Sequence, residues 1–560
     1  MRKRFFPSLA LSIAAVCFLS PLWSRQLPSR KPASPAAERL ADSHYQRGLA
    51  ALMQKQISVA VRELRLAVRD APKSAEAHNA LGQALELDDQ LDAAVVEFRK
   101  AIALKPDFAE AYRNMGRALE RRRDLDGAIS FYQGTLRLRP DWAEVHYALG
   151  TVLGHRGNLL GAKEEFEKAL KANPDFADAH YHLGVADWFL QDYARAIVEL
   201  NAAIKLRPGH ADAHFRLGLA EQQAGREEEA LTELRAAVQL EPSSAQFHNG
   251  LGLAFQRNGY LADAAAEFRK TIELDPKSAD ARNNLGLVMI AQRDAEGAVA
   301  EFRAAIQADP KNFAARNNLG LAQLQKAQWE DAIRTFRALI DLDPGNAEAY
   351  YNLGVALKQK QDFDEAIRAL DRAVELNPEL PEARFTRGVI FWQQGKLDEA
   401  AAELRASIKL RPDNQQAHSI LGSVLRQKGQ LDAALAELRE AVRLDPEDGG
   451  AHQALGTTLR QKGDAAAAGE ESRKAEALNK KLMNLQAATL STNTGARQLR
   501  EGDVDGSIEK FRSALKLAPD FAAAHYQLGL ALLKKGERAE ARAEFEKARR
   551  LDPHLKPPLD

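Results

Sequence analysis

The chain has 560 residues, and its 78 lysines and arginines are balanced by 78 aspartates and glutamates. A content of 45% hydrophobic and 28% charged residues is typical of a folded protein rather than a disordered chain. Zero net charge argues against a dedicated nucleic-acid binder, which needs a basic surplus to neutralise phosphates. The single cysteine, Cys17, excludes an intramolecular disulfide framework and a thiolate zinc cluster.

The first 40 residues differ in character from the rest of the chain. Three basic residues at positions 2–4 precede an uncharged, largely apolar run at residues 5–23, which is the pattern of a secretory signal. The run has 19 residues, close to the ~20 that an uncleaved membrane anchor requires. No small-residue cleavage site directly follows it. We predict an exported protein, periplasmic or extracytoplasmic and tethered to the membrane. Residues 1–23 then form a signal anchor or a cleaved signal peptide, and residues 24–40 form a proline-rich linker.

A repeat of 34 residues governs the remainder of the chain. Prolines mark it without slippage at Pro72, Pro106, Pro140, Pro174, Pro208, Pro242, Pro276, Pro310, Pro344, Pro378, Pro412 and Pro446. Glycines keep the same period at Gly48, Gly82, Gly116, Gly150, Gly184, Gly218, Gly252, Gly286, Gly320, Gly354, Gly388, Gly422 and Gly456. These are called marker glycines below. The period shifts by five residues before resuming at Gly495 and Gly529.

One unit, residues 346–377, shows what each repeat predicts. Apolar residues recur at i, i+3, i+4 and i+7 in two successive segments, which indicates two amphipathic helices joined by a short turn. Asn346 is placed to cap the first helix, and Pro378 stops the second because it lacks an N–H. The small residues Gly354 and Ala366 allow the two helices to approach closely. Each unit is therefore predicted to be a helix hairpin that cannot bury its apolar face alone.

These residues resemble the tetratricopeptide repeat family, whose signature is a leucine-glycine pair, two alanines around a large apolar residue, and a closing proline. One clean copy is Leu81, Gly82, Ala94, Phe98, Ala101 and Pro106. About 15 such units cover residues 41–555. The resemblance implies an all-α fold, a right-handed superhelical solenoid of stacked antiparallel helix hairpins.

The repeat pattern is interrupted once. The unit at 449–482 has Lys480 in place of its proline and Ser472 in place of a large apolar residue, and five extra residues follow at 483–487. We predict a block of about 13 repeats at 41–482 with a degenerate last repeat, the insertion at 483–487, two further repeats at 488–555 and a tail at 556–560. The second helix of the degenerate unit is expected to run on by ~7 Å, at 1.5 Å per residue. The interruption is either a joint between two blocks or a decayed repeat without consequence.

Nine histidines share one repeat position, which superficially suggests a metal site. Equivalent positions in adjacent hairpins are about 8–10 Å apart, too far for zinc bonds of ~2 Å. We therefore interpret them as structural residues and predict no metal and no cofactor. No phosphate-binding loop, dinucleotide, metalloprotease or nucleophile-elbow motif occurs, so we do not expect an enzyme. The nine are His44, His78, His146, His180, His214, His248, His418, His452 and His525.

One recurring feature is not required by packing. Asn284, Asn318 and Asn352 each lie two residues before a marker glycine, and Asn114 occupies the same place in a distant unit. The resemblance implies that this position lines the concave face, where asparagines grip the backbone of an extended peptide. An amide suits that role because it both donates and accepts. The alternative is that asparagine is merely tolerated on an exposed face.

Two tryptophans lie on the same predicted helices. Trp188 and Trp392 fall four residues after marker glycines and are either anchors for a ligand or fillers between hairpins. The asparagine of the carboxylate clamp found in some members of the family would follow the marker glycine directly. This chain has apolar residues such as Leu253 and Leu321 there, so that activity is not implied.

The sequence thus predicts a non-catalytic scaffold that binds protein or peptide partners in the concave groove of a solenoid. Nucleic acid is not an expected partner, and membrane contact is expected only through residues 5–23. Two alternatives remain open. One is a self-associating architectural protein of the cell envelope, and the other is an accessory subunit of an enzyme carried on another chain.

Overall fold

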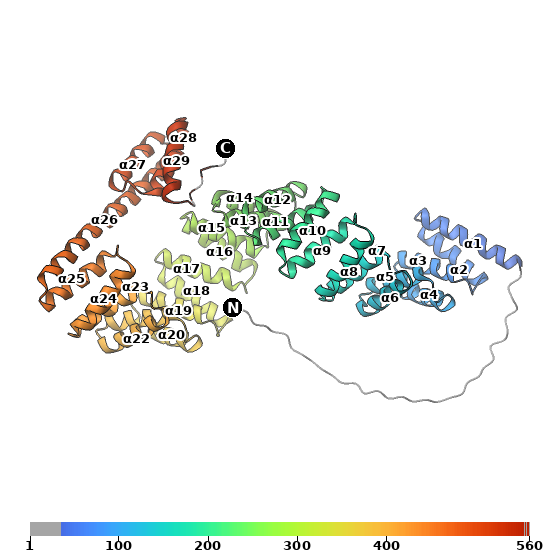
Figure 1. The fold of residues 1–560 in the computed structure, drawn as a ribbon, viewed down its shortest axis with the longest axis horizontal. Helices are drawn as coiled ribbons and strands as arrows, with labels where there is room; N and C mark the ends of the chain where they lie inside the picture. Colours follow the sequence, from blue (N-terminus) through green and yellow to red (C-terminus); the bar gives the residue numbers. More distant parts are fainter. Residues whose placement is uncertain (1–34, 554, 556, 559–560) are drawn as a thin grey trace, which may run out of the picture. The chain divides into compact units, whose positions relative to one another are not determined.

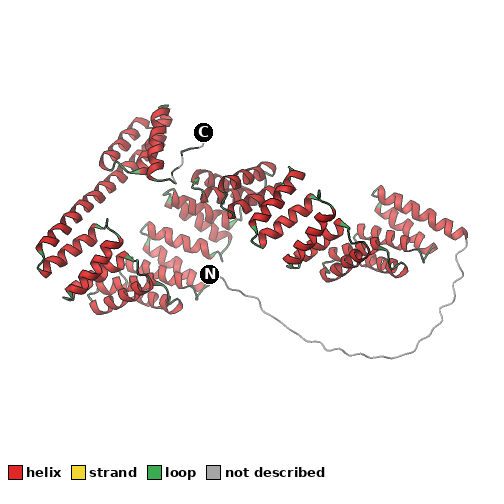
Figure 2. Cartoon of the chain, in the orientation of Figure 1, coloured by secondary structure: helices red, strands yellow, loops and turns green. Residues whose placement is uncertain are grey.

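The computed structural model describes residues 35–553, 555, 557 and 558. Every regular element in this described part is an α-helix, and consecutive helices pack as antiparallel hairpins (Figures 1 and 2). The predicted signal or anchor at 1–23, and most of the linker at 24–40, lie outside the described residues. The chain divides into two compact units, Met1–Asp175 and Phe176–Asp560.

The first unit contains four hairpins. In each, a first helix (A) is followed by a second (B), and the next A helix packs on the preceding hairpin. The helices are α1 (Pro35–Met53), α2 (Ile57–Asp70), α3 (Ala75–Leu87), α4 (Leu91–Leu104), α5 (Ala109–Arg121), α6 (Leu125–Leu138), α7 (Ala143–His155) and α8 (Leu159–Ala172).

The second unit continues the pattern, with odd-numbered A helices and even-numbered B helices as far as α26. Its first ten helices are α9 (Ala177–Phe189), α10 (Tyr193–Leu206), α11 (Ala211–Gln223), α12 (Glu227–Leu240), α13 (Ala245–Arg257), α14 (Leu261–Leu274), α15 (Ala279–Ala291), α16 (Ala295–Ala308), α17 (Phe313–Gln325) and α18 (Trp329–Leu342). The remainder are α19 (Ala347–Gln359), α20 (Phe363–Leu376), α21 (Pro381–Gln393), α22 (Leu397–Leu410), α23 (Gln415–Gln427), α24 (Leu431–Leu444), α25 (Gly449–Lys462), α26 (Ala465–Glu501), α27 (Val504–Leu517), α28 (Ala522–Lys535) and α29 (Arg538–Leu551).

Local sequence explains where these helices begin and turn. The Asn346 side chain accepts a hydrogen bond of 3.0 Å from the backbone N–H of Ala349, which confirms its predicted capping role. Helix α20 ends at Leu376, immediately before Asn377 and Pro378, as predicted. The turn inside the hairpin needs a left-handed residue, which is Gly395 in one unit and Gln361 in the equivalent place of the preceding one.

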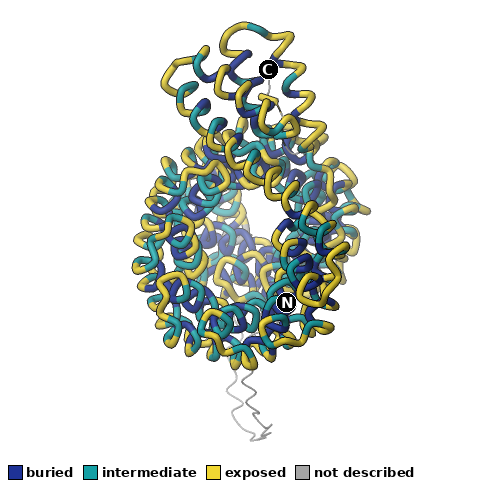
Figure 3. Tube along the Cα trace, turned by 90° about the vertical axis from the view of Figure 1, so that its left-hand side faces the viewer, coloured by how far each residue is buried: buried dark blue, intermediate teal, exposed yellow. Residues whose placement is uncertain are grey.

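The marker glycines let the two helices of a hairpin touch. Each faces the large residue 16 positions later, such as Phe336 for Gly320 and Leu370 for Gly354. The core therefore runs along every hairpin, and buried positions alternate with exposed ones along the trace (Figure 3). The degenerate unit is the exception, because the residue 16 positions after Gly456 is the small Ser472, and a Cβ at Gly456 would meet it and the backbone of Ala468 at 3.2 Å.

Helix α26 extends further than the sequence predicts. Instead of ending shortly after residue 480, it runs from Ala465 to Glu501, 37 residues in all, and serves as both the B helix of one hairpin and the A helix of the next. The part beyond Lys480 is ~32 Å long at 1.5 Å per residue, compared with the expected extension of ~7 Å. The helix continues for two reasons. Lys480 replaces the proline that ends other B helices, and the inserted residues 483–487 contain neither a glycine nor a capping turn.

Candidate functional site

Asparagines connect successive A helices in the second unit. The amide nitrogen of Asn318 on α17 donates to the side-chain oxygen of Asn283 on α15, at 2.8 Å. Asn352 on α19 donates likewise to Asn317, at 3.0 Å. Asn284 donates to Asn249 on α13, at 3.4 Å. We call the six residues the asparagine ladder, and they are Asn249, Asn283, Asn284, Asn317, Asn318 and Asn352.

The four predicted asparagines differ in exposure. Asn284 and Asn318 are half-buried, and Asn352 is 5% exposed. Asn114 lies in the first unit and is fully buried, where its amide donates to Asn79 at 2.9 Å. The structure therefore brings Asn284, Asn318 and Asn352 together in one series and gives Asn114 a separate bond between α3 and α5.

An apolar row runs beside the ladder. Every marker glycine from α9 to α21 is followed directly by leucine or valine, and each of these is at least partly exposed. Leu253 and Leu321 are the most open, at 40% exposure each. Because Leu321 lies three residues after Asn318, the two share one helix face. The row comprises Val185, Leu219, Leu253, Leu287, Leu321, Val355 and Val389.

The first unit has no continuous row, since Leu49 is followed at the equivalent positions by Gln83, Arg117 and Thr151. Sequence reasoning noticed several members of the row only as departures from a carboxylate clamp. In the sequence, the signal was the unbroken repetition of leucine or valine directly after the marker glycines from Gly184 to Gly388.

The two tryptophans are half-buried and packed within the second unit. Trp392 donates its indole N–H to Gln427 of the next A helix, at 3.1 Å. The indole nitrogen of Trp188 is buried without a hydrogen-bond partner, and the Arg216 guanidinium lies 5.9 Å from its ring centroid. Both side chains therefore contribute to contacts between neighbouring hairpins.

The nine repeated histidines form hydrogen-bonded pairs with glutamates within their own hairpins. In each pair, Nδ1 lies 2.5–2.8 Å from a glutamate of the following B helix, 19 residues later. The described residues contain no group of three or more metal-ligating side chains placed to hold an ion. The pairs explain why histidine recurs at this position, as the structural interpretation predicted.

Sequence reasoning missed a buried acid in the second unit. Glu221 on α11 is 6% exposed and occupies a position where Phe255 and Leu357 stand in other units. Burial raises the pKa of Glu221 to about 7, and the nearby carboxylates of Glu233 and Glu229 add to the rise. An acid at a periodic apolar position was the signal in the sequence.

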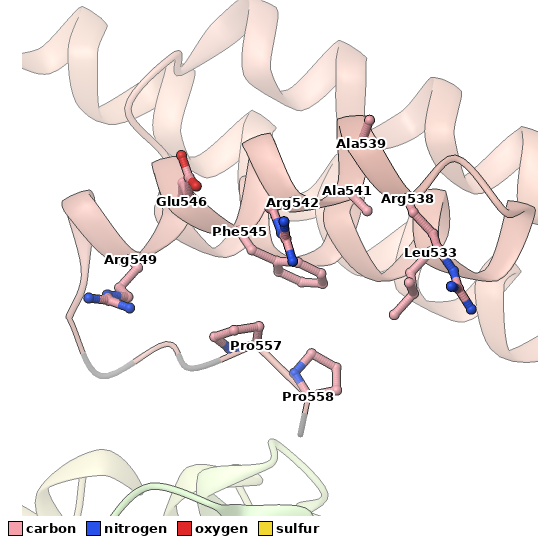
Figure 4. A pocket seen from close by; sticks show the side chains of 10 residues that line it. All are labelled: Leu533, Arg538, Ala539, Ala541, Arg542, Phe545, Glu546, Arg549, Pro557 and Pro558. Carbon is pink, nitrogen blue, oxygen red and sulfur yellow. The ribbon is translucent and has the colours of Figure 1, made fainter. Parts of the chain in front are cut away.

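A cavity of about 750 Å³ lies beside the last hairpin (Figure 4). Leu533 and Phe545 provide its apolar wall, and the rings of Pro557 and Pro558 lie opposite. The guanidinium groups of three arginines also line it, namely Arg538, Arg542 and Arg549.

None of the described helices combines the length and the hydropathy needed to cross a bilayer. The apolar run at 5–23 is not among the described residues.

Solved structures with similar folds include YrrB, titled a TPR protein with an unusual peptide-binding site. It is 23% identical, spans 33% of this chain and 95% of its own, and has a TM-score of 0.30. Yeast Tom70 is 18% identical over 86% of this chain and 98% of its own, with a TM-score of 0.35. The pilF protein of Pseudomonas aeruginosa is 25% identical over 36% of this chain and 92% of its own, with a TM-score of 0.32. No curated protein sequence matches the chain significantly.

Models of the repeat family match most of the described hairpins. A tetratricopeptide repeat model matches residues 147–188, 249–313, 317–381, 356–415, 385–449, 421–480 and 494–555, which together exceed half of the chain. Other models of the same repeat match residues 88–122, 111–141, 177–210 and 221–259. With its 34-residue period and its stacked hairpins, the chain belongs to the tetratricopeptide repeat family.

Proposed function

We propose that the chain is a non-catalytic scaffold that binds an extended peptide along the A helices of the second unit. Its fold is typical of proteins that bind other proteins. The observation that carries the proposal is the parallel course of the asparagine ladder and the apolar row on α13–α19. We assign this surface to the concave face on the basis of the family resemblance.

The two sets of side chains offer complementary contacts. The donating amides of Asn284 and Asn318 are half-buried, and each has a second N–H and an oxygen that the ladder bonds do not use, so they can pair with a peptide N–H or C=O. Leu253 and Leu321 expose apolar surface one helical turn away, where a ligand's apolar side chains would be shielded from water. Such a surface favours extended, apolar segments and binds them with low sequence specificity.

A peptide-selection experiment tests this proposal. A library of 12-residue peptides would be selected on residues 41–560, and the binders measured against Leu253→Ser/Leu321→Ser. We expect affinity to fall at least tenfold, roughly 1.4 kcal/mol. The matched control is Leu342→Ser/Leu410→Ser, two B-helix leucines with similar exposure of 42% and 41%. Equal binding by both double variants would overturn the proposal.

Self-association is the second candidate, because α26 exposes apolar side chains in its middle. Leu482, Met483 and Leu490 are 53%, 69% and 70% exposed. A mass that rises with concentration in sedimentation equilibrium, and that Met483→Lys/Leu490→Lys restores to the monomer, would favour an architectural role. An accessory subunit would use the same surface and differ only in its partner. Binding of an enzyme to this surface would indicate that role.

We further propose that the protein is exported and tethered to the membrane through residues 5–23, or released there by cleavage. Fractionation followed by N-terminal sequencing separates these outcomes. Recovery of the intact chain in the soluble cytoplasmic fraction would contradict export.

A further inference from the structure

The histidine position places each imidazole between two hydrogen-bond acceptors. Nδ1 of His146 lies 2.6 Å from the Glu165 carboxylate on α8, and its Nε2 lies 2.8 Å from the backbone carbonyl of Pro140. The same two contacts, to a glutamate 19 residues later and to a proline carbonyl six residues earlier, recur in His78, His146, His214, His248, His418, His452 and His525.

Neither acceptor can donate a proton. A neutral imidazole has one N–H and satisfies only one of the two partners, whereas the imidazolium ion satisfies both. The loss of the proton leaves a part-buried carboxylate or carbonyl without its donor, which costs more than the bond itself contributed. The geometry therefore calls for a cation with two donors.

Arginine provides independent support from within the same chain. Arg282 occupies the histidine position in another repeat, and its two terminal nitrogens donate to Glu301 at 3.2 Å and to the Pro276 carbonyl at 3.3 Å. Arg316 donates to the Pro310 carbonyl in the same way, at 2.9 Å. Arginine stays charged at every physiological pH, so these repeats keep their cation permanently.

Other charged groups surround the imidazole of His146. Lys168 on α8 binds the free oxygen of Glu165 at 2.6 Å. Lys171 and Asp141 line the same cavity of about 580 Å³ as His146. Burial alone would lower the pKa of His146, but the bonds to Glu165 and Pro140 raise it above its ordinary value. Burial alone would raise the pKa of Glu165, but the bonds from His146 and Lys168 lower it.

Five of the other six histidines also have further charged groups beside the pair. A lysine also binds the paired glutamate of His78, His452 and His525. A second acid stands near the glutamate or the histidine in two more repeats, namely Glu221 beside Glu233 and Glu440 beside His418, the latter with Arg443. The charged groups around His525 are Arg512, Lys516, Asp520, Glu544, Lys547 and Arg550.

We propose that these seven histidines are pH-dependent clamps, each of which ties an A helix to its own B helix and to the preceding loop while the imidazole is protonated. The clamps are closed in mildly acidic solution and open as the pH rises. The repeat that carries Arg282 at this position stays closed, because arginine makes both contacts there. The protein is therefore a solenoid in which alkaline pH loosens some repeats and leaves others fixed.

Reciprocal substitutions in the full chain test the proposal. Backbone amide hydrogen exchange would be followed at pH 6.0, 7.0 and 8.5 and expressed as protection factors, which removes the intrinsic pH dependence of exchange. We expect protection of α7 and α8 to fall by roughly threefold or more between pH 6.0 and 8.5. His146→Arg should abolish that fall, and Arg282→His should create one in α15 and α16.

Two further results decide the matter. If the wild type and His146→Arg show the same pH profile, or if Arg282→His shows none, the clamp proposal is wrong. If His146→Arg does not fold, ¹⁵N spectra of the wild-type histidines at pH 6 remain decisive. Seven imidazolium rings are expected there, and neutral rings at these positions would overturn the proposal.

Discussion

The aromatic ring of Phe336 occupies the space that a side chain on Gly320 would need. A Cβ added to Gly320 would lie 2.5 Å from two carbons of that ring, closer than real Cβ contacts. This single relationship, repeated along the chain with phenylalanine, tyrosine or leucine as the facing residue, sets how closely the two helices of a hairpin pack.

Substitution of Gly320 should therefore destabilise the hairpin α17–α18. We expect Gly320→Ala to cost about 1–3 kcal/mol and Gly320→Leu more, because the ring must move away. Thermal unfolding measures the loss. Gly345→Ala is the matched control, since its nearest contact would be an ordinary 3.6 Å. A melt unchanged by Gly320→Leu would refute the close-approach argument.

Removal of one donor from the asparagine ladder should loosen two neighbouring A helices. Asn318→Ala loses the 2.8 Å bond and leaves the oxygen of Asn283 without this donor, at a cost of about 1 kcal/mol. Urea unfolding monitored by circular dichroism would report it. Asn493→Ala, at an exposed position of α26, should change stability little. If the two substitutions cost the same, the ladder bond contributes nothing to stability.

Glu221 should make the second unit less stable in alkaline solution. Its folded pKa of about 7 exceeds the ordinary 4.5, so the folded state holds the proton more tightly than the unfolded state. Stability from this group is consequently present at low pH, declines as the pH rises from about 4.5 to 7, and then levels off. Glu221→Gln should be nearly neutral at pH 4.5 and stabilise by roughly 3 kcal/mol at pH 8. Melting temperatures of the two proteins across this range provide the check, and parallel curves would contradict the assignment.

Proline should break α26 at its midpoint. Gln486→Pro removes a backbone N–H and clashes with the preceding turn, at a cost of about 3 kcal/mol. We expect amide exchange to accelerate around residues 482–490, while Gln486→Ala leaves it unchanged. Retained protection in the proline variant would mean that this stretch does not depend on helical hydrogen bonds.

The sequence predicted the hairpins well because their determinants are local. Asn346 caps a helix and Pro378 ends one through their own chemistry, so no knowledge of the neighbours was needed. Helix α26 was misjudged because the repeat period was extrapolated across residues 483–487. No proline and no capping turn stands between Ala465 and Glu501 to end the helix there.

The side-chain network was harder to predict because its partners lie on other helices. The sequence predicts Asn318 as a peptide contact, but its bond to Asn283 depends on how α15 and α17 align. The regular glutamate 19 residues after each histidine was visible in the sequence, and it would have explained His146 without a structure. The raised pKa of Glu221 could not be predicted from the sequence, because it results mainly from the burial of its side chain.

The continuity of α26 also determines how the chain yields to tension. Elsewhere in the second unit a turn separates each helix from the next, so a stretched molecule can release one hairpin at a time. Each release of 34 residues lengthens the chain by about 115 Å, at ~3.4 Å per extended residue. Across α26 the load passes through one unbroken run of 37 residues shared by two hairpins. Rupture of this helix therefore frees both hairpins together, as a single larger step in the force–extension record.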